Sequence, residues 1–318
     1  MKKTLRLTSI LSATIVMFML YSCSKSNQVD PAPEQTTQMT ADGKHVYGLL
    51  PTPPEEYELA PKYSEQLFPK KFNNLSVTPA PAVLTLATPA VRDQGQIGSC
   101  TGFCGTEAYE ILYNYKNGSF PPVLSPGFLY YEERVNILHQ KITADNGANM
   151  INIDQALQTY GECTEALYVY PSSDRSTAYK TPPGATAVSN ALNYKISSYG
   201  LINTGDTAAV KNLIRNNVPV MMGFNVYDNT ATYQYFEGLN TTSYTYNPLT
   251  ASGALAKGVR LLGGHAVPII GYDDTKQAFL IENSWGTAWG LHGFFYLPYS
   301  VFKSTTVVPQ GGVYYATI

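Results

Sequence analysis

Apolar residues recur at helical spacing in four stretches, and each stretch has a typical helix boundary at one end or both. The first runs from Cys100, after a possible cap at Ser99, to Asn117, where Gly118 closes it. The second follows Ser125-Pro126 and continues to Leu138. The other two cover Ile153–Tyr160 and the residues that follow Asp206.

Runs of β-branched and aromatic residues between turn residues predict the strands. Helices therefore prevail in the first half of the chain and strands in the second, with Asp273 to Lys276 suited to a hairpin turn. This order predicts an α+β fold with a helical N-terminal lobe, an antiparallel β C-terminal lobe and a cleft between them. The predicted strands are Val218–Val226, His265–Tyr272, Ala278–Glu282, Gly293–Leu297 and Val313–Thr317.

Residues 1–22 have the pattern of a signal peptide, with early lysines and an apolar run from Leu7 to Leu20 that is too short to span a membrane. The stretch Leu20-Tyr21-Ser22-Cys23 resembles a bacterial lipobox, which implies cleavage before Cys23 and acylation of this cysteine. We therefore expect a protein that a lipid on Cys23 anchors in the bacterial cell envelope, at the outer membrane. An ordinary secreted protein is the alternative.

Residues 23–82 form a second region, which holds the lipidated cysteine, a polar tether up to about Thr40 and a proline-rich stretch from Tyr47 to Ala82. We expect that stretch to be extended and to lie on the domain surface. Residues 83–318 form the main domain. The chain has 318 residues, 44% of them hydrophobic, and a formal net charge of −2, so it can bury a large core and gives no reason to expect a nucleic-acid partner.

Cys100 stands at the start of a predicted helix, where the helix dipole lowers the pKa of a thiol and favours the nucleophilic thiolate. Gln94 lies six residues upstream in a glycine-containing loop. If that loop folds back, the Gln94 amide and the backbone N–H of Cys100 form a two-donor oxyanion hole.

A histidine and an asparagine with matching roles occur far downstream. His265 heads an apolar strand after Gly263-Gly264, which lets backbone or substrate approach the ring closely. Asn283 falls on the adjacent hairpin strand, where its side chain can accept a hydrogen bond from the imidazole, and Trp285 can shield that bond from water.

Three motifs together resemble the papain family of cysteine peptidases, and the likeness extends from about Val91 to the C-terminus. The motifs are Gln94-Gly95-Gln96-Ile97-Gly98-Ser99-Cys100, then Gly264-His265-Ala266-Val267, then Asn283-Ser284-Trp285-Gly286. The resemblance implies the papain-like fold, Gln94 as oxyanion donor, Cys100 as nucleophile, His265 as acid and base, and Asn283 as the residue that orients the imidazole. It also implies Gly147, Gly264 and Trp285 as substrate-binding residues.

The expected partner is a protein or peptide substrate bound by a monomer, and the reaction needs neither a metal nor an organic cofactor. Two alternatives stay open: a papain-like lipoprotein that binds peptides without turnover, and a cell-wall amidase or transamidase that uses the same site. Cys104 and Cys163 either form a disulfide or remain buried thiols.

Overall fold

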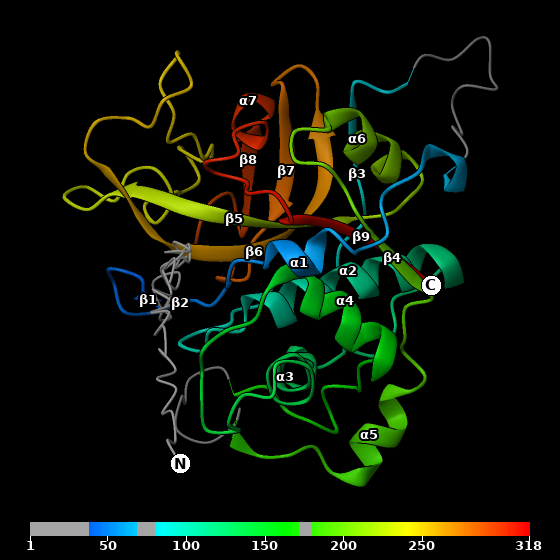
Figure 1. Ribbon diagram of the computed structural model, residues 1–318. Helices are drawn as coiled ribbons and strands as arrows, with labels where there is room; N and C mark the ends of the chain where they lie inside the picture. Colours follow the sequence, from blue (N-terminus) through cyan, green and yellow to red (C-terminus); the bar gives the residue numbers. More distant parts are fainter. Residues whose placement is uncertain (1–37, 69–79, 172–179) are drawn as a thin grey trace, which may run out of the picture. The chain divides into compact units, whose positions relative to one another are not determined.

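One antiparallel sheet of seven strands forms much of the fold (Figure 1). The computed structural model describes residues 38–68, 80–171 and 180–318. The strands follow the order β4-β9-β5-β6-β7-β8, and β3 pairs with β6. Their bounds are Val83–Thr85 (β3), Ser198–Leu201 (β4), Val220–Asn229 (β5), Val259–Asp273 (β6), Ala278–Glu282 (β7), Phe294–Pro298 (β8) and Val313–Thr317 (β9). A separate two-stranded pair joins β1 (Gln38–Met39) to β2 (Val46–Tyr47).

The helices α2 to α5 gather on one side of this sheet, and α2 lies between the sheet and the others (Figure 1). This arrangement gives a mainly helical part and a mainly β part, so the predicted α+β architecture is confirmed. The helices are Pro54–Tyr57 (α1), Cys100–Asn117 (α2), Pro126–Tyr131 (α3), Met150–Thr159 (α4), Ala185–Ala191 (α5), Thr207–Arg215 (α6) and Tyr299–Phe302 (α7). A 3-10 turn covers Glu65–Leu67 (η1), and a π-helical turn covers Glu132–Ile137 (η2).

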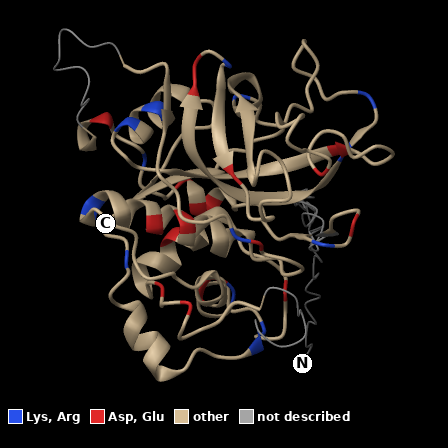
Figure 2. Cartoon of the chain, turned by 180° about the vertical axis from the view of Figure 1, so that it is seen from behind, with Lys and Arg blue, Asp and Glu red and all other residues tan. Residues whose placement is uncertain are grey.

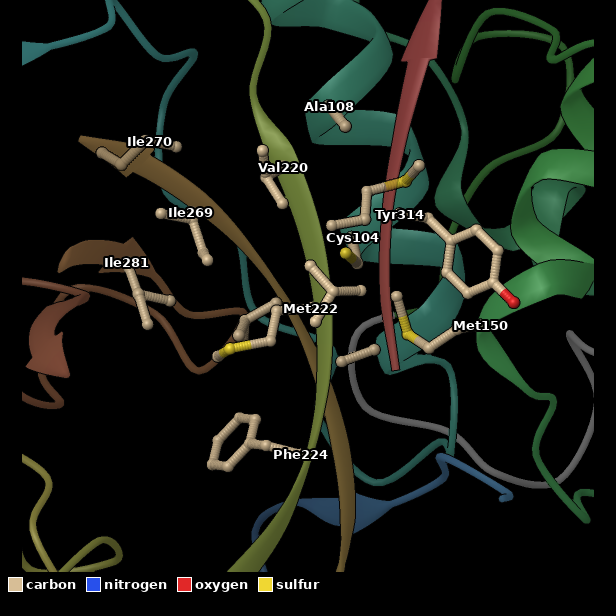
Figure 3. Close-up of a cluster of buried hydrophobic side chains, with 14 of the residues drawn as sticks. Cys104, Ala108, Met150, Val220, Met222, Phe224, Ile269, Ile270, Ile281 and Tyr314 are labelled. Carbon is tan, nitrogen blue, oxygen red and sulfur yellow. The ribbon is translucent and has the colours of Figure 1, made fainter. Parts of the chain in front are cut away.

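The core lies where α2 packs against the sheet (Figure 3). Cys104 and Ala108 project from α2 toward the strand that carries Val220 and Met222, and all of these side chains are buried. The helix also approaches its neighbours closely, because a Cβ at Gly105 would lie 2.4 Å from Cγ2 of Ile153. Burial of side chains of this size contributes about 1–3 kcal/mol each, so this contact fixes α2, and with it the position of Cys100.

Acidic residues are buried on and around α2, in the middle of the view of Figure 2. Arg92 donates to the carboxylate of Glu110 at 2.7 Å. Burial raises the pKa of Glu107 well above its usual value, and the neighbouring carboxylate of Glu282 raises it further. Burial therefore favours the protonated form of Glu107, whereas the carboxylate of Glu110 has Arg92 as its partner.

The four predicted helices are confirmed, with small shifts at their ends. Ser125 caps α3 through its side chain, and Asp206 caps α6 in the same way. Strand β6 begins at Val259, six residues before the predicted start, because it continues to pair with β5 as far as Asn229. Helix α5 and strands β3 and β4 were not predicted, since each is short and carries few apolar residues in a regular pattern.

The prediction of an extended surface stretch from Tyr47 to Ala82 is wrong at its beginning. Tyr47 is 2% exposed and Leu49 is 7% exposed, and a helical turn follows at Pro54–Tyr57. Residues 69–79 of this stretch lie outside the described residues, as do the predicted signal peptide, Cys23 and most of the tether. None of the helices in the described part of the chain combines the length and apolar character that a membrane span requires.

Candidate active site

Cys100 is the first residue of α2 and is fully buried. Backbone groups of Ala266 and Gly48 hydrogen-bond to its sulfur, which places the thiol beside the strand that carries His265. Burial nevertheless raises the pKa of the Cys100 thiol to about 12, because these bonds only partly offset the loss of hydration. In this form the thiol is protonated.

His265 and Asn283 form a direct hydrogen bond. The distance from Nε2 of His265 to Oδ1 of Asn283 is 2.7 Å, and the same oxygen accepts the backbone N–H of Ser284 at 2.9 Å. Because that oxygen is an acceptor, Nε2 of His265 carries the proton. Nδ1 is then the unprotonated nitrogen of the neutral ring, and it is buried without a hydrogen-bond partner in the described part of the chain.

Aromatic rings surround the imidazole of His265. The ring centroids of Trp285 and Phe224 lie 5.3 and 5.9 Å from it. This burial lowers the pKa of His265 to about 4, while the hydrogen bond to Asn283 acts in the opposite direction. The imidazole is therefore neutral, and the site holds a thiol and an imidazole rather than an ion pair.

The side chain of Gln94 is oriented by the loop that follows Asn283. Its backbone N–H donates to the carbonyl of Ser284 at 2.8 Å, and its Oε1 accepts from the Ser284 hydroxyl, also at 2.8 Å. With Oε1 fixed in this way, Nε2 donates to the carbonyl oxygens of Val46 at 2.9 Å and Ile97 at 3.0 Å. The amide predicted to hold an oxyanion thus already binds a carbonyl of another chain segment.

That segment, residues 46–50, crosses the site and is held by backbone hydrogen bonds. The N–H of Leu49 donates to the carbonyl of Gly264 at 3.1 Å. Ala148 donates its N–H to Gly48 at 3.1 Å and accepts the N–H of Leu50 at 2.8 Å. Gly48 itself fits because it lacks a side chain, since a Cβ there would lie 1.8 Å from a backbone carbonyl oxygen. Below, residues 46–50 are called the cleft segment.

Gly147 lies against the cleft segment, but the adjacent Ala148 makes the backbone hydrogen bonds to it. Gly147 has a φ of +80°, and a Cβ there would lie 1.9 Å from the carbonyl oxygen of Gly48. A glycine is therefore required at this position both by its backbone conformation and by the close approach of the cleft segment.

His45 and Tyr47 contact residues around the site through their side chains. The His45 ring stacks on Trp285 with centroids 4.7 Å apart, and its Nε2 lies 3.1 Å from the Asp93 carboxylate. The hydroxyl of Tyr47 donates to Glu237 at 2.9 Å. A cavity of about 480 Å³ remains beside these residues, with Trp285 in its wall.

The fold brings together Gln94, Cys100, His265 and Asn283, and it places Gly264 and Trp285 at their sides. The cleft segment was not predicted, because its only signal in the sequence is the short apolar run Val46-Tyr47-Gly48-Leu49-Leu50. Of the two states left open for Cys104 and Cys163, the structure has the buried, free thiols.

The family model described as papain family cysteine protease matches residues 85–308. An uncharacterised peptidase C1-like protein of Acanthamoeba polyphaga mimivirus is 30% identical over 217 residues, which are 65% of this chain and 63% of the relative. Cysteine proteinase 3 of Dictyostelium discoideum is 27% identical over 66% of this chain and 56% of its own length. The chain thus matches less than two thirds of the length of either relative.

Solved structures show the same fold. Xylellain, a cysteine protease from Xylella fastidiosa, superposes with a TM-score of 0.71 and 24% identity over 89% of this chain and 97% of that chain. Procathepsin L 3 from the larval midgut of Tenebrio molitor gives a TM-score of 0.54 and 22% identity over 76% of this chain and 72% of that chain.

Proposed function

Because the chain belongs to the papain family of cysteine proteases, we propose that it is a cysteine peptidase that uses Cys100, His265, Asn283 and Gln94. The observation that carries this proposal is the cleft segment itself. A peptide backbone lies beside the Cys100 sulfur, bound through Gly264 and Ala148, with a carbonyl on the Gln94 amide. These contacts support a site that holds an extended peptide and donates hydrogen bonds to its carbonyl groups.

The reaction is acyl transfer in two stages. The Cys100 sulfur attacks the carbonyl carbon of a bound peptide while its proton passes to Nδ1 of His265. The Gln94 amide and the N–H of Cys100 stabilise the oxyanion that forms. His265 then protonates the leaving amine as the C–N bond breaks. In the second stage water attacks the thioester, gives a proton to His265, and releases the carboxylic acid and the thiol.

The covered form is a latent state of this peptidase. Gly48 presents its backbone N–H, not its carbonyl carbon, to the sulfur, so the segment binds without being placed for attack. It also excludes water, and the exclusion keeps both Cys100 and His265 neutral. Release of the segment would rehydrate the site and allow the thiolate–imidazolium pair to form.

Peptide turnover with labelling of Cys100 tests this function. The test uses Gly48→Val, which opens the cleft because a side chain at this position cannot fit. In this variant an epoxide-type thiol electrophile should label Cys100 alone, and cleavage of a mixed peptide library should disappear when Cys100→Ala is added. Labelling without cleavage would favour the peptide-binding lipoprotein. Release of peptide or amine from peptidoglycan, with no cleavage of proteins, would favour the amidase.

We also propose that a lipid on Cys23 anchors the protein at the outer membrane of a bacterial cell envelope. The support is the basic start, the apolar run and the lipobox-like Leu20-Tyr21-Ser22-Cys23. Metabolic labelling with a fatty acid should mark the wild-type protein. A Cys23→Ala variant that still carries the label would refute the anchor.

A further inference from the structure

The loop that ends at Ala148 is fixed by buried and half-buried polar side chains. Gly147 donates its N–H to the Tyr130 hydroxyl at 3.1 Å and accepts from the Gln140 amide at 2.9 Å. Arg134 donates to the carbonyl of Ala144. Since these neighbouring groups are engaged, the N–H and carbonyl of Ala148 are held in place to pair with the chain in the cleft.

The same framework reaches the loop that leads to the nucleophile. The Tyr130 hydroxyl donates to the Asp145 carboxylate at 2.7 Å. That carboxylate also accepts the backbone N–H of Gly98, at 3.1 and 3.2 Å to its two oxygens. Gly98 stands two residues before Cys100. Two side chains, here named the Tyr130–Asp145 strap, thus connect the loop of the thiol to the loop that binds a peptide backbone.

We propose that Tyr130 and Asp145 are positioning residues, which set the distance between the Cys100 sulfur and a peptide paired with Ala148. The inference rests on the proposed function, because it concerns how a peptide substrate is presented to the nucleophile. Neither side chain touches the reacting atoms. Their effect is on where the scissile carbonyl lies once the peptide is bound.

Substitution of Tyr130 by phenylalanine tests the role of its hydroxyl separately from that of its ring. The ring lies 4.6 Å from the guanidinium carbon of Arg134 and is buried, so a phenylalanine would keep this packing. Only the hydroxyl, which donates to Asp145 and accepts from Gly147, would be lost. The adjacent Tyr131 supplies the matched control, since its hydroxyl makes no hydrogen bond within the described part of the chain.

The first test is hydrogen exchange in the full chain, which needs no turnover. Tyr130→Phe should accelerate exchange of the Leu50 and Ala148 amides by roughly tenfold, the factor expected from one or two lost hydrogen bonds. Tyr131→Phe should leave both rates unchanged. Unchanged Leu50 and Ala148 rates in Tyr130→Phe would overturn the proposal, whatever the activity of the protein.

The second test is kinetic and uses the full chain with Gly48→Val, in which the added side chain cannot fit in the cleft. In this background Tyr130→Phe should raise KM for peptides about tenfold, with kcat and the rate of Cys100 alkylation by iodoacetamide within about twofold of the parent. Asp145→Ala should raise KM to the same extent. Asp145→Asn, which keeps an acceptor oxygen, should raise KM less.

Equal losses in KM, kcat and alkylation would indicate a general structural role and would also overturn the positioning role. A parent that cleaves no peptide refutes the peptidase instead, and the exchange rates then still decide whether the strap holds Ala148.

Discussion

The side-chain amide of Gln94 donates a hydrogen bond to the backbone carbonyl of Val46 at 2.9 Å. The proposed oxyanion donor is therefore occupied by a carbonyl from the same chain, in a cleft where the nucleophile and the base are both buried. We propose that the Gln94 amide binds a carbonyl of the substrate, and in this form it binds one of the chain's own.

Displacement of the cleft segment should expose the thiol. Gly48→Val adds a side chain whose Cβ would lie 1.8 Å from the carbonyl oxygen of Gly98, so the segment cannot keep its place. Alkylation of Cys100 and cleavage of peptides should both rise by at least about tenfold, since a covered site reacts only in the fraction of molecules that open. Mass spectrometry of the alkylated chain measures the rate of Cys100 alkylation.

Lys44→Ala is the control for that variant, because Lys44 is exposed in the same part of the chain and pairs only with Asp42 among the described residues. It should react like the wild type. Equal rates in Gly48→Val and the wild type would mean that the segment does not restrain the enzyme.

The pH dependence of alkylation should differ between the covered and the opened chain. Burial raises the pKa of Cys100 to about 12, so the thiolate fraction of the covered chain should grow about tenfold per pH unit throughout the range from 6 to 9. Removal of the segment rehydrates the thiol and lowers its pKa, and the rate in Gly48→Val should level off within that range. The rate of alkylation by iodoacetamide is measured at each pH for both proteins. The same pH dependence in the wild type and in Gly48→Val would argue against the latent state.

Asn283 should affect the chemical step and not the binding of peptides. Its Oδ1 lies 2.7 Å from Nε2 of His265 and orients the ring. Asn283→Ala in the Gly48→Val background should lower kcat by about 10- to 100-fold, the factor expected from loss of a hydrogen bond that becomes charged in the reaction. KM should stay within about twofold. Asn117→Ala, at the exposed end of α2, is the control; a rise in KM alone in Asn283→Ala would contradict this role.

Gly223 should set the size of one substrate pocket. A Cβ at Gly223 would lie 2.7 Å from both Cδ2 of Leu49 and Cγ of Met150, so the Leu49 side chain fills the space that this glycine leaves. The opened chain, Gly48→Val, should prefer a branched aliphatic residue at one position of its substrates. In that background, Gly223→Val should reduce the preference for leucine over alanine at this position about tenfold in a peptide library. An unchanged preference would place the pocket elsewhere.

Much of this fold and site follows from patterns in the sequence. The cap at Ser125 and the apolar spacing in α2 are local signals, and they predict helices that the structure has. The distant residues Cys100, His265 and Asn283 were grouped by motif, because each role needs a particular residue type with particular neighbours.

The cleft segment and the strap could not be predicted in the same way. Val46 and Leu49 are bound in the cleft through backbone groups, which leave little mark on residue identity beyond Gly48 and the short apolar run around it. Likewise, nothing in the sequence near Asp145 indicates that its carboxylate reaches the N–H of Gly98. Such contacts depend on tertiary packing between segments that are far apart in the chain.

Turnover by the opened full chain, Gly48→Val, with and without Cys100, tests most directly whether this protein is a cysteine peptidase. We expect a thiol electrophile to modify Cys100 while the buried Cys104 and Cys163 stay unmodified, and peptide cleavage to fall to background in Gly48→Val with Cys100→Ala. Peptide cleavage that persists without Cys100 would show that Cys100 is not the nucleophile.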